Sequence, residues 1–315
     1  MKLLNQYLKE KYGCKVYKLS ISAKVTCPNR DGTLGTRGCI FCSEGGSGDF
    51  AEDATKPIKQ QIEDAKKKVS AKIKGKALYI AYFQSFTNTY ADIDYLREIY
   101  YQAIEPEEIV ALSIGTRPDC LGDEVIRLLS EINKIKPVWV ELGLQTIHEE
   151  SAKYIRRGYE LCVYDDAVRR LRKDNIDVIT HVILGLPGET QEDMAETVKY
   201  VVASGVQGIK LQLLHVLKGT DLAKDYEENK FETMSLDEYI ELLQKLIPLI
   251  PDNVIIHRLT GDGPKKSLIA PLWSGNKKVV LNRINKEVIY SCHFVPRIYQ
   301  PSHLESISSK GLVDT

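Results

Sequence analysis

The chain has 315 residues, of which 43% are hydrophobic and 27% are charged, as is usual for a soluble globular protein of one large or two small domains. Lysine plus arginine and aspartate plus glutamate each total 43, so net charge gives no reason to expect a nucleic acid, a membrane or an acidic partner. The polar stretch 1–11 and the lack of any apolar run near about 18 residues argue against a signal peptide and a membrane-spanning helix. We therefore expect a cytoplasmic protein with no membrane association.

Short apolar runs alternate with longer amphipathic stretches up to about residue 214. The predicted strands are 16–21, 77–83, 109–114, 137–144, 177–184 and 208–214, and the helices between them are 56–73, 93–103, 123–133, 164–173 and 192–203. Short, mostly apolar strands are typical of a parallel sheet that helices cover. The pattern predicts an α/β fold, a partial (β/α)6 barrel, with a flat doubly wound sheet as the alternative.

The pattern changes after the sixth predicted strand. A helix over 236–247 is followed by a short strand over 254–258, a polar stretch rich in Gly and Pro over 260–274, and a helix from Asn276. We read these elements as a C-terminal α/β extension that covers the barrel. The expected organisation is a core over 1–220, the extension over 221–290 and a polar tail over 291–315.

Three cysteines gather in the loop 23–48, which follows the first predicted strand. Cys27, Cys39 and Cys42 have the spacing C-x11-C-x2-C, and the other four cysteines form no such pair. Three thiolates are too few to close a tetrahedral zinc site, whereas on a four-iron cluster they leave one iron open. The loop lies at the carboxyl edge of the sheet, where β/α folds place their sites. A zinc site with a remote fourth ligand, or cysteines that are neighbours by chance, are the alternatives.

The run Cys-Pro-Asn-Arg-Asp-Gly (27–32) before Cys-Ile-Phe-Cys (39–42) resembles the cysteine loop of the radical SAM superfamily. It is most similar to the branch of the elongator catalytic subunit and the oxygen-independent coproporphyrinogen oxidase, and within it to the YhcC/YtqA-type proteins. The resemblance implies a radical SAM barrel whose Cys27, Cys39 and Cys42 hold a 4Fe-4S cluster that binds S-adenosylmethionine. It also implies an enzyme in which reductive cleavage of this cofactor gives a 5′-deoxyadenosyl radical that takes a hydrogen from substrate. A flavodoxin or ferredoxin is the implied electron donor.

Polar residues near the ends of the second and fourth strands are candidates for binding S-adenosylmethionine. Gln84 and Ser85 follow the second strand, where this chain lacks the glycines that related families carry. Glu141 and Gln145 share one face of the fourth strand by alternation. The resemblance places Gln145 near the ribose, and Arg157 matches an arginine that meets the methionine carboxylate. The alternatives are a helix cap after the second strand, a buried ion pair for Glu141 and a surface arginine.

The fifth and sixth strands complete the expected cofactor site. The resemblance places the fifth strand against the adenine, with His181 where relatives often carry an acidic residue. Leu214 matches a segment whose backbone holds the adenine. A histidine on a strand is also commonly a hydrogen-bonded core residue, and that alternative stays open for His181.

Five further residues are candidates for substrate contacts. They are Arg117 after the third strand, Lys210 and His215 on and after the sixth, and Arg258 and Asp262 at the end of the 254–258 strand. Arg117 could instead pair with Asp119. Lysine pairs at 265–266 and 277–278, with Arg283 and Trp273, make an RNA-facing surface conceivable, and a solvated surface is the alternative.

Three functions remain open from the sequence. Because the elongator-like branch is associated with the tRNA wobble uridine, the resemblance implies modification of that side chain, for instance trimming a carboxymethylaminomethyl to an aminomethyl group. A radical SAM enzyme for a small metabolite is the second possibility. The third is a non-catalytic zinc-binding interaction module.

Overall fold

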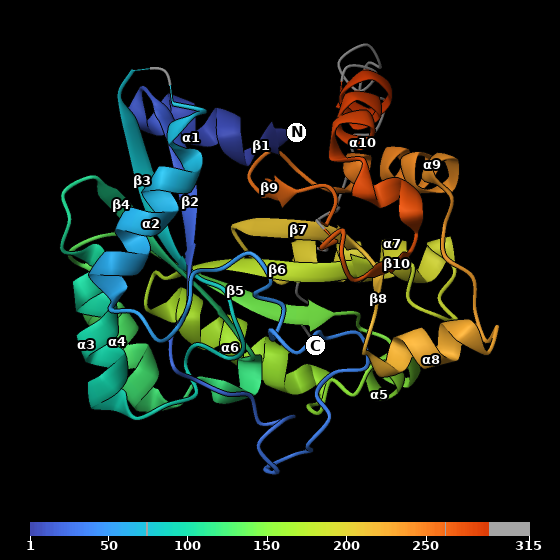
Figure 1. The fold of residues 1–315 in the computed structure, drawn as a ribbon, viewed down its shortest axis with the longest axis horizontal. Coiled ribbons are helices and arrows are strands. Elements are labelled where there is room, and N and C mark those ends of the chain that lie inside the picture. The colour runs from blue at the N-terminus through green and yellow to red at the C-terminus, as the bar shows by residue number, and fades with distance from the viewer. Residues whose placement is uncertain (74, 262, 290–315) are drawn as a thin grey trace, which may run out of the picture.

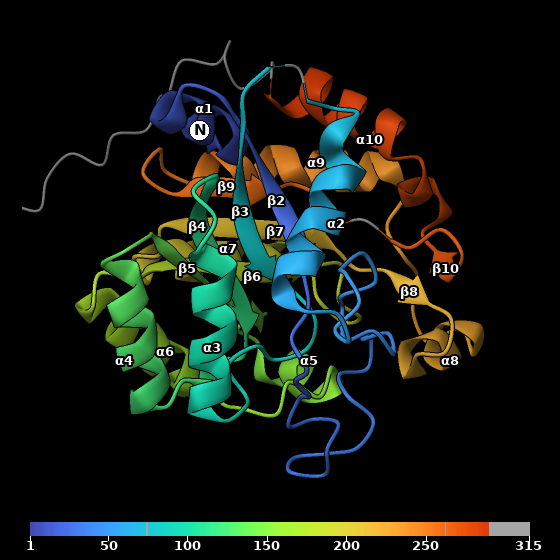
Figure 2. The same ribbon diagram turned by 60° about the vertical axis from the view of Figure 1, so that its left-hand side comes forward.

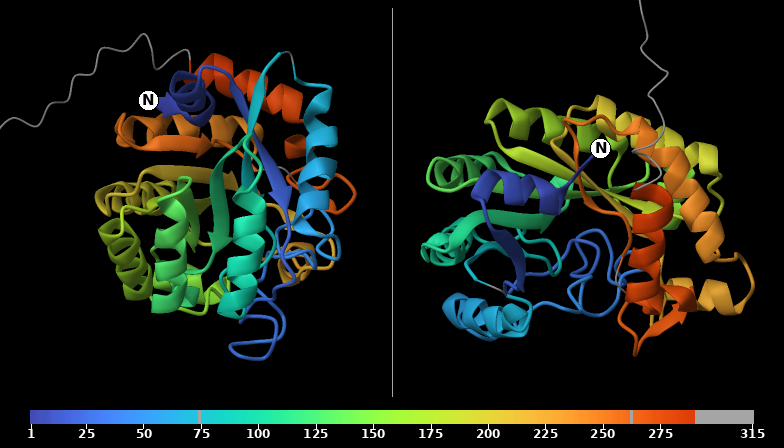
Figure 3. Two further views of the ribbon diagram at one scale, coloured as in Figure 1. Left: turned by 90° about the vertical axis from the view of Figure 1, so that its left-hand side faces the viewer. Right: turned by 90° about the horizontal axis from the view of Figure 1, so that it is seen from above.

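The computed structural model describes residues 1–73, 75–261 and 263–289, and its centre is a curved parallel sheet with eight strands (Figures 1 and 3). The strand order is β1-β9-β7-β6-β5-β4-β3-β2, and every neighbouring pair is parallel. The strands are β1 Lys2–Leu3, β2 Lys15–Ile21, β3 Ala77–Phe83, β4 Ile109–Thr116, β5 Val138–Gln145, β6 Asp177–Leu184, β7 Gly208–Leu213 and β9 Ile255–Arg258. Because β2 to β7 are neighbours in chain order with no reversal, the predicted partial barrel is confirmed over the flat doubly wound alternative.

Helices cover the outer, convex face of this sheet (Figure 2). The α-helices of the described residues are α1 Leu4–Tyr12, α2 Ile58–Ser70, α3 Ile93–Ile104, α4 Asp123–Asn133, α5 Glu149–Tyr154, α6 Leu161–Lys173, α7 Gln191–Ala203, α8 Asp221–Glu227, α9 Leu236–Leu246 and α10 Lys277–Arg283. Side-chain caps begin several of them: Asp92 caps α3, and Thr190 and Ser235 form capping boxes that begin α7 and α9. The short helices α1, α5 and α8 were not predicted, because fewer than three turns give little periodicity.

The C-terminal part of the described chain widens the half-barrel. β9, predicted as part of the extension, pairs with β7 and carries the two-residue β1 on its other side, so the sheet continues past the six predicted strands. β10 (Leu268–Ala270) lies within the predicted polar stretch and pairs antiparallel with β8 (Val216–Leu217). Asn276 caps α10, and a π-helical segment, Ile284–Ile289, continues it. Asp262 and the predicted tail 291–315 lie outside the described residues.

The alternation of β5 shows how the sheet separates core from site. Val140, Leu142 and Leu144 are fully buried in the main core beneath the helices. Glu141 and Gln145, on the other face, point into the concave side of the sheet and line a cavity there. A core under the helices therefore fixes strands whose opposite faces are free to carry polar groups. In the part of the chain that the structure describes, no helix has the length and apolar character needed to cross a bilayer.

Candidate functional site

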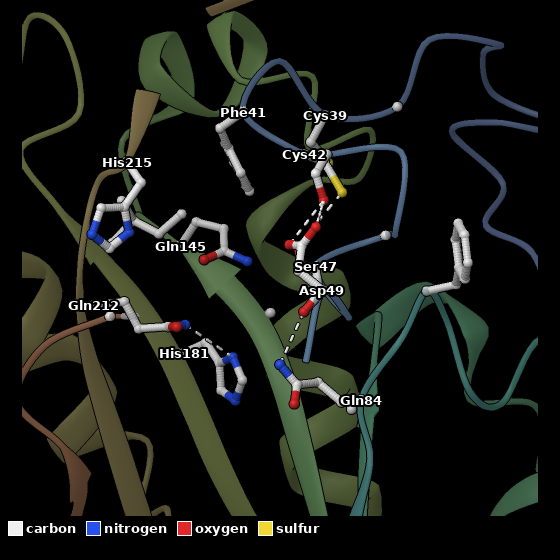
Figure 4. Close-up of a pocket in the computed structure, with 18 of the residues that line it drawn as sticks. Cys39, Phe41, Cys42, Ser47, Asp49, Gln84, Gln145, His181, Gln212 and His215 are labelled. Atoms are coloured by element: carbon white, nitrogen blue, oxygen red, sulfur yellow. Dashed lines mark hydrogen bonds between the residues drawn. The ribbon is translucent and has the colours of Figure 1, made fainter. Parts of the chain in front are cut away.

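A cavity of about 380 Å³ opens on the concave side of the sheet, between the strand ends and the loop after β2. All of the predicted site residues that the structure describes line it except Ser85; Asp262 lies outside the described residues. The lining residues among them are Cys27, Cys39, Cys42, Gln84, Arg117, Glu141, Gln145, Arg157, His181, Lys210, Leu214, His215 and Arg258. Figure 4 shows Cys39 and Cys42 on the loop at the top of the view, with His181 and Gln212 below them. Side chains separated by more than 230 residues in the sequence thus meet in one space.

Ser85 supports the cysteine loop and does not line the cavity. Its buried hydroxyl lies 2.8 Å from the hydroxyl of Ser22. It also packs so closely against Gly48 that a Cβ on this glycine would lie 1.9 Å from Ser85 Oγ. Its neighbour Gln84 does line the cavity, and its Nε2 donates to the carbonyl of Ser47 at 2.9 Å. The end of β3 thus holds the loop in place.

The three cysteines of the loop are free thiols that face the cavity. Asn29 Nδ2 contacts Cys39 Sγ at 3.4 Å and donates to the carbonyl of Arg156 at 2.7 Å. Burial, and then the neighbouring Cys42, raise the pKa of the Cys39 thiol to about 12. The thiolates would therefore need a cationic centre to stabilise them.

The separation of the thiols bears on which centre they suit. A tetrahedral zinc ion at about 2.3 Å from each sulfur would bring thiolates to roughly 3.8 Å from one another. Among the described residues, the group of potential ligand atoms that all lie within 4.8 Å of one another is that of His148, Asp193 and Glu196, not that of the cysteines. The three thiols do not all lie within this distance of one another, so at least one pair of sulfurs is farther apart than a single tetrahedral ion would hold them.

Arginines anchor the cysteine loop to its surroundings. Arg30 Nη2 donates to the carbonyls of Cys42 and Ser43, at 3.1 and 2.6 Å. Arg37 from the loop and Arg156 from beyond α5 both pair with Asp221 at the start of α8, the latter at 2.7 Å. Hydrogen bonding from Arg156 lowers the pKa of Asp221 to about 2. Asp221 thus connects the loop to the C-terminal part of the chain.

Replacing Asp221 with asparagine is expected to loosen this connection. Because the pairs are partly exposed, the loss should be about 1–2 kcal/mol of unfolding free energy, together with lower iron content after reconstitution. Chemical denaturation and iron analysis would measure the two effects. Asp64→Asn is the matched control, since Asp64 also has a pKa lowered to about 2, by Lys56, but lies on α2. Equal iron content in the two variants would contradict the anchoring role.

Deeper in the cavity, the carboxylate of Glu141 is fully buried and collects four donors. Its Oε1 accepts from Ser113 Oγ at 2.7 Å and from Lys18 Nζ. Its Oε2 accepts from Lys210 Nζ and lies 2.8 Å from His181 Nε2. The ion pair considered for Glu141 is therefore present, and it faces the cavity. We call Lys18, Ser113, Glu141, His181, Lys210 and Arg258 the cavity floor.

The charges of the floor act strongly on one another. Burial would raise the pKa of Glu141, but Lys18 and Lys210 outweigh burial and hold it well below its usual value. Burial, reinforced by Lys18 and Arg258, lowers the pKa of Lys210 to about 7 despite the attraction of Glu141. Burial and Lys210 lower the pKa of His181 to about 4, so this histidine is neutral at pH 7. The floor thus combines one ionised carboxylate with cations that repel each other.

Closer to the cysteines, two predicted residues keep polar atoms without a hydrogen-bond partner among the described residues. Gln145, at a positive φ of 72°, has such an atom in its buried Oε1. Arg157 is 2% exposed and donates to the carbonyls of Tyr159 and Thr146, at 3.0 and 2.7 Å. Its Nη2 makes no hydrogen bond and lies 3.6 Å from Glu149. Buried polar atoms without a hydrogen-bond partner call for an explanation, and a bound ligand, ion or water supplies one.

Three other predicted residues make contacts within the protein. Arg117 lines the cavity and pairs with Asp119 through two hydrogen bonds, at 2.9 and 2.7 Å. The backbone N–H of Leu214 donates to the carbonyl of Leu184 at 2.9 Å. His215 packs on the turn after β9, where a Cβ on Gly261 would lie 2.8 Å from its ring.

Some of the side chains considered for an RNA-facing surface make contacts within the protein instead. Trp273 packs against Tyr239 and donates its Nε1–H to the carbonyl of Met234 at 2.9 Å. Arg283 pairs with Asp237 and Glu287. The aromatic ring is therefore part of the packing, while the side chains of Lys265, Lys266 and Lys278 are exposed.

Sequence reasoning missed several residues of the floor and its walls. They are Lys18 on β2, Tyr82 on β3 and Ser113 on β4. Lys18 carried a usable signal, because a lysine inside an apolar strand rarely lies there without a partner. Ser113 carried none, since small polar residues are common in buried strands.

Comparison with known proteins gives four findings on family and fold. A model of the Radical SAM superfamily matches residues 32–201, and a model of the Radical_SAM C-terminal domain matches residues 206–290. YtqA of Bacillus subtilis is 46% identical over 306 residues, 96% of this chain and 94% of YtqA. A tRNA uridine(34) acetyltransferase of Methanocaldococcus jannaschii is 26% identical over 170 residues, 53% of this chain and 31% of that protein. The solved structure of an Elp3 from Methanocaldococcus infernus covers 86% of this chain and 63% of its own, with a TM-score of 0.64 at 18% identity, which shows a shared fold.

Proposed function

The chain belongs to the radical SAM superfamily, and from this premise we propose that it cleaves S-adenosylmethionine reductively at a 4Fe-4S cluster and modifies the side chain of a tRNA wobble uridine. The resemblance to YtqA-type members, predicted from the cysteine loop, is confirmed by the similarity to YtqA along nearly the whole chain. When bound together, the cluster and S-adenosylmethionine supply a 5′-deoxyadenosyl radical. The residues of this chain would supply the binding, the orientation and the electrostatic environment of these groups.

The observation that carries the proposal is one cavity that holds three free thiols together with the predicted cofactor residues. Cys27, Cys39 and Cys42 would hold the cluster, and their three ligands leave one iron for the amino acid part of S-adenosylmethionine. The Nη2 of Arg157, which makes no hydrogen bond and lies 3.6 Å from Glu149, suits a carboxylate, and the Oε1 of Gln145, which has no hydrogen-bond partner among the described residues, suits a hydroxyl donor such as a ribose. The residues present therefore fit both groups.

The tRNA part of the proposal rests on weaker support. A relative that matches 53% of this chain is named for its action on uridine 34 of tRNA. The exposed Lys265, Lys266 and Lys278 supply positive charge for a phosphate backbone on the C-terminal part of the chain. We propose that contacts between these lysines and the phosphate backbone bring the wobble uridine to the cavity.

A reductive cleavage assay tests the function directly. Anaerobically reconstituted protein would be incubated with S-adenosylmethionine and dithionite, with and without bulk tRNA, and 5′-deoxyadenosine would be quantified. We expect the product to form, and tRNA to increase its rate. Lack of product from protein with verified cluster content would contradict the cleavage reaction. Product that tRNA does not stimulate would point to a small-molecule substrate.

Arg157→Gln is expected to weaken S-adenosylmethionine binding by about tenfold, because a charge-assisted hydrogen bond contributes roughly 1.5 kcal/mol or more. The measurement is equilibrium dialysis with the labelled cofactor on cluster-loaded protein. Iron content should be unchanged, since Arg157 bonds no cysteine in the structure. Arg157→Lys should recover part of the affinity. An unaltered dissociation constant in Arg157→Gln would remove this arginine from the cofactor site.

A further inference from the structure

The side chain of Asn29 lies between the cysteine loop and the turn 156–158, and it is only 5% exposed. Its Nδ2 lies 3.4 Å from Cys39 Sγ and donates to the carbonyl of Arg156 at 2.7 Å. Its backbone carbonyl accepts from the N–H of Gly38 at 2.7 Å. The turn also packs tightly against the amide, because a Cβ on Gly158 would lie 2.9 Å from Asn29 Oδ1. The amide is therefore held from both sides.

The contacts of this amide fix which of its atoms faces the sulfur. The carbonyl of Arg156 can only accept a hydrogen bond, so the group that faces it is the NH2 of Asn29 and not the oxygen. One N–H of that group bonds the carbonyl, and the second is available to Cys39 Sγ. The thiol proton of Cys39, which faces the same carbonyl at 3.8 Å, is lost when the sulfur binds iron. The sulfur is then an acceptor only, and the N–H···S bond becomes charge-assisted.

The environment of Asn29 differs from that of a second polar side chain that contacts a cysteine of the loop. Ser47 Oγ lies 3.5 Å from Cys42 Sγ, but Ser47 is exposed and lines the cofactor cavity, so water can take the place of its hydroxyl. Asn29 is buried and lines a separate hollow together with Gly35 and Arg37. A donor that is shielded from water has the stronger electrostatic effect.

A hydrogen bond to a cluster sulfur acts differently on the two oxidation states of the cluster. Reduction adds one electron to the thiolate-bound cluster, so the sulfurs become more negative. A donor that points at one of these sulfurs stabilises the reduced state more than the oxidised state, and the reduction potential rises.

We propose that Asn29 is a positioning residue that raises the reduction potential of the cluster through an N–H···S hydrogen bond to Cys39. The inference rests on the proposed function for the presence of the cluster, and it adds a residue that makes the reduction easier. The cluster takes one electron from the reductant, which is dithionite in the test below. No covalent bond of Asn29 forms or breaks, and no proton moves.

The test is a redox titration of cluster-loaded protein with dithionite, followed by electron paramagnetic resonance in the absence of S-adenosylmethionine. Asn29→Leu removes the donor and keeps nearly the same volume. The equilibrium constant for reduction should fall about tenfold, which for one electron lowers the potential by about 59 mV. Asn29→Gln keeps an amide and should recover part of this loss. Ser47→Ala is the matched control, with a change of about twofold or less, or about 18 mV.

The sign of the shift separates a lost donor from a loosened loop. Water that reached the cluster through a loosened loop would favour the more highly charged reduced state, and the potential would rise. A potential that stays the same or rises in Asn29→Leu would therefore overturn the inference. So would a shift in Ser47→Ala as large as that in Asn29→Leu, because general loosening of the loop would then account for both.

A measurement on the unaltered protein decides the question if Asn29→Leu fails to hold a cluster. Protein labelled with ¹⁵N in its asparagines should show a ¹⁵N coupling to the reduced cluster in pulsed electron paramagnetic resonance, and a lack of coupling would overturn the hydrogen bond. Protein that holds no 4Fe-4S cluster would overturn both this inference and the proposed function. The expected potential shift without any 5′-deoxyadenosine in the cleavage assay would support the role of Asn29 and contradict the proposed reaction.

Discussion

Replacing Cys39 with alanine is expected to lower the iron content from about four per chain to below about one, and to reduce 5′-deoxyadenosine formation to that of iron-free protein. The Cys39 thiol lies against Asn29 and the backbone of Arg156. The two thiolates that remain, those of Cys27 and Cys42, are too few to hold a four-iron centre. Iron and sulfide analysis after anaerobic reconstitution, with the visible absorption of the cluster, would measure the loss.

Cys120→Ala is the control for this prediction. Cys120 lies outside the loop but near Cys27, and burial, Asp119 and, to a lesser extent, Cys27 raise the pKa of the Cys120 thiol to about 12. The Cys120→Ala variant should keep its full iron content. Loss of iron from Cys120→Ala, or retention in Cys39→Ala, would show that the ligand set has been assigned wrongly.

Glu141→Gln is expected to destabilise the fold by about 3–5 kcal/mol, the cost of breaking a buried ion pair from one side. The amide has nearly the same shape but leaves Lys18, Lys210 and Arg258 without their anion. Urea unfolding at pH 7 would measure the loss. Glu149→Gln is the control, because Glu149 is half exposed and lies 3.6 Å from its arginine. A loss below about 1 kcal/mol would contradict the electrostatic description of the floor.

The pH dependence of stability gives a second measure of the same cluster. The folded-state pKa of Lys210 is about 7, below its usual 10.5, so between these values the unfolded chain binds the proton that the folded chain has lost. The unfolding free energy should therefore rise as pH increases from 7 to 9. Glu141 stays ionised and His181 neutral across this window. Lys210→Met should flatten the rise and should restore much of the stability lost in Glu141→Gln.

The sheet and the cysteine loop could be predicted because their signals are local. The apolar runs of β2 to β7 and the spacing of the three cysteines can each be read within about 20 residues. The position of β9 was not readable, because pairing with β7 and β1 is decided by contacts between segments about 45 and 250 residues apart. Sequence placed the 254–258 strand in a covering extension, and the structure shows it as a wall of the barrel.

The site residues also divide into those that local sequence could predict and those that depend on contacts between distant segments. The alternation of side chains along β5 predicted that Glu141 and Gln145 share one face of the strand, and both residues line the cavity. The same argument could not give the partners of Glu141, because Lys18 and Lys210 come from strands on opposite sides of it. Ser85 was misplaced because its neighbour Gly48, in an irregular loop, lets the serine turn away from the cavity. Loop conformation of this kind leaves little trace in a single sequence.

The place of β9 in the sheet has a consequence for the order in which the protein is made. The cysteines leave the ribosome early, but the strand that carries Arg258 and closes the floor follows roughly 200 residues later. At about 5–20 residues per second, that interval lasts on the order of 10–40 seconds. The nascent chain thus exposes its cysteine loop well before a closed pocket exists to shelter a metal centre. Any metal centre on this loop would therefore be fully enclosed only once β9 has been made.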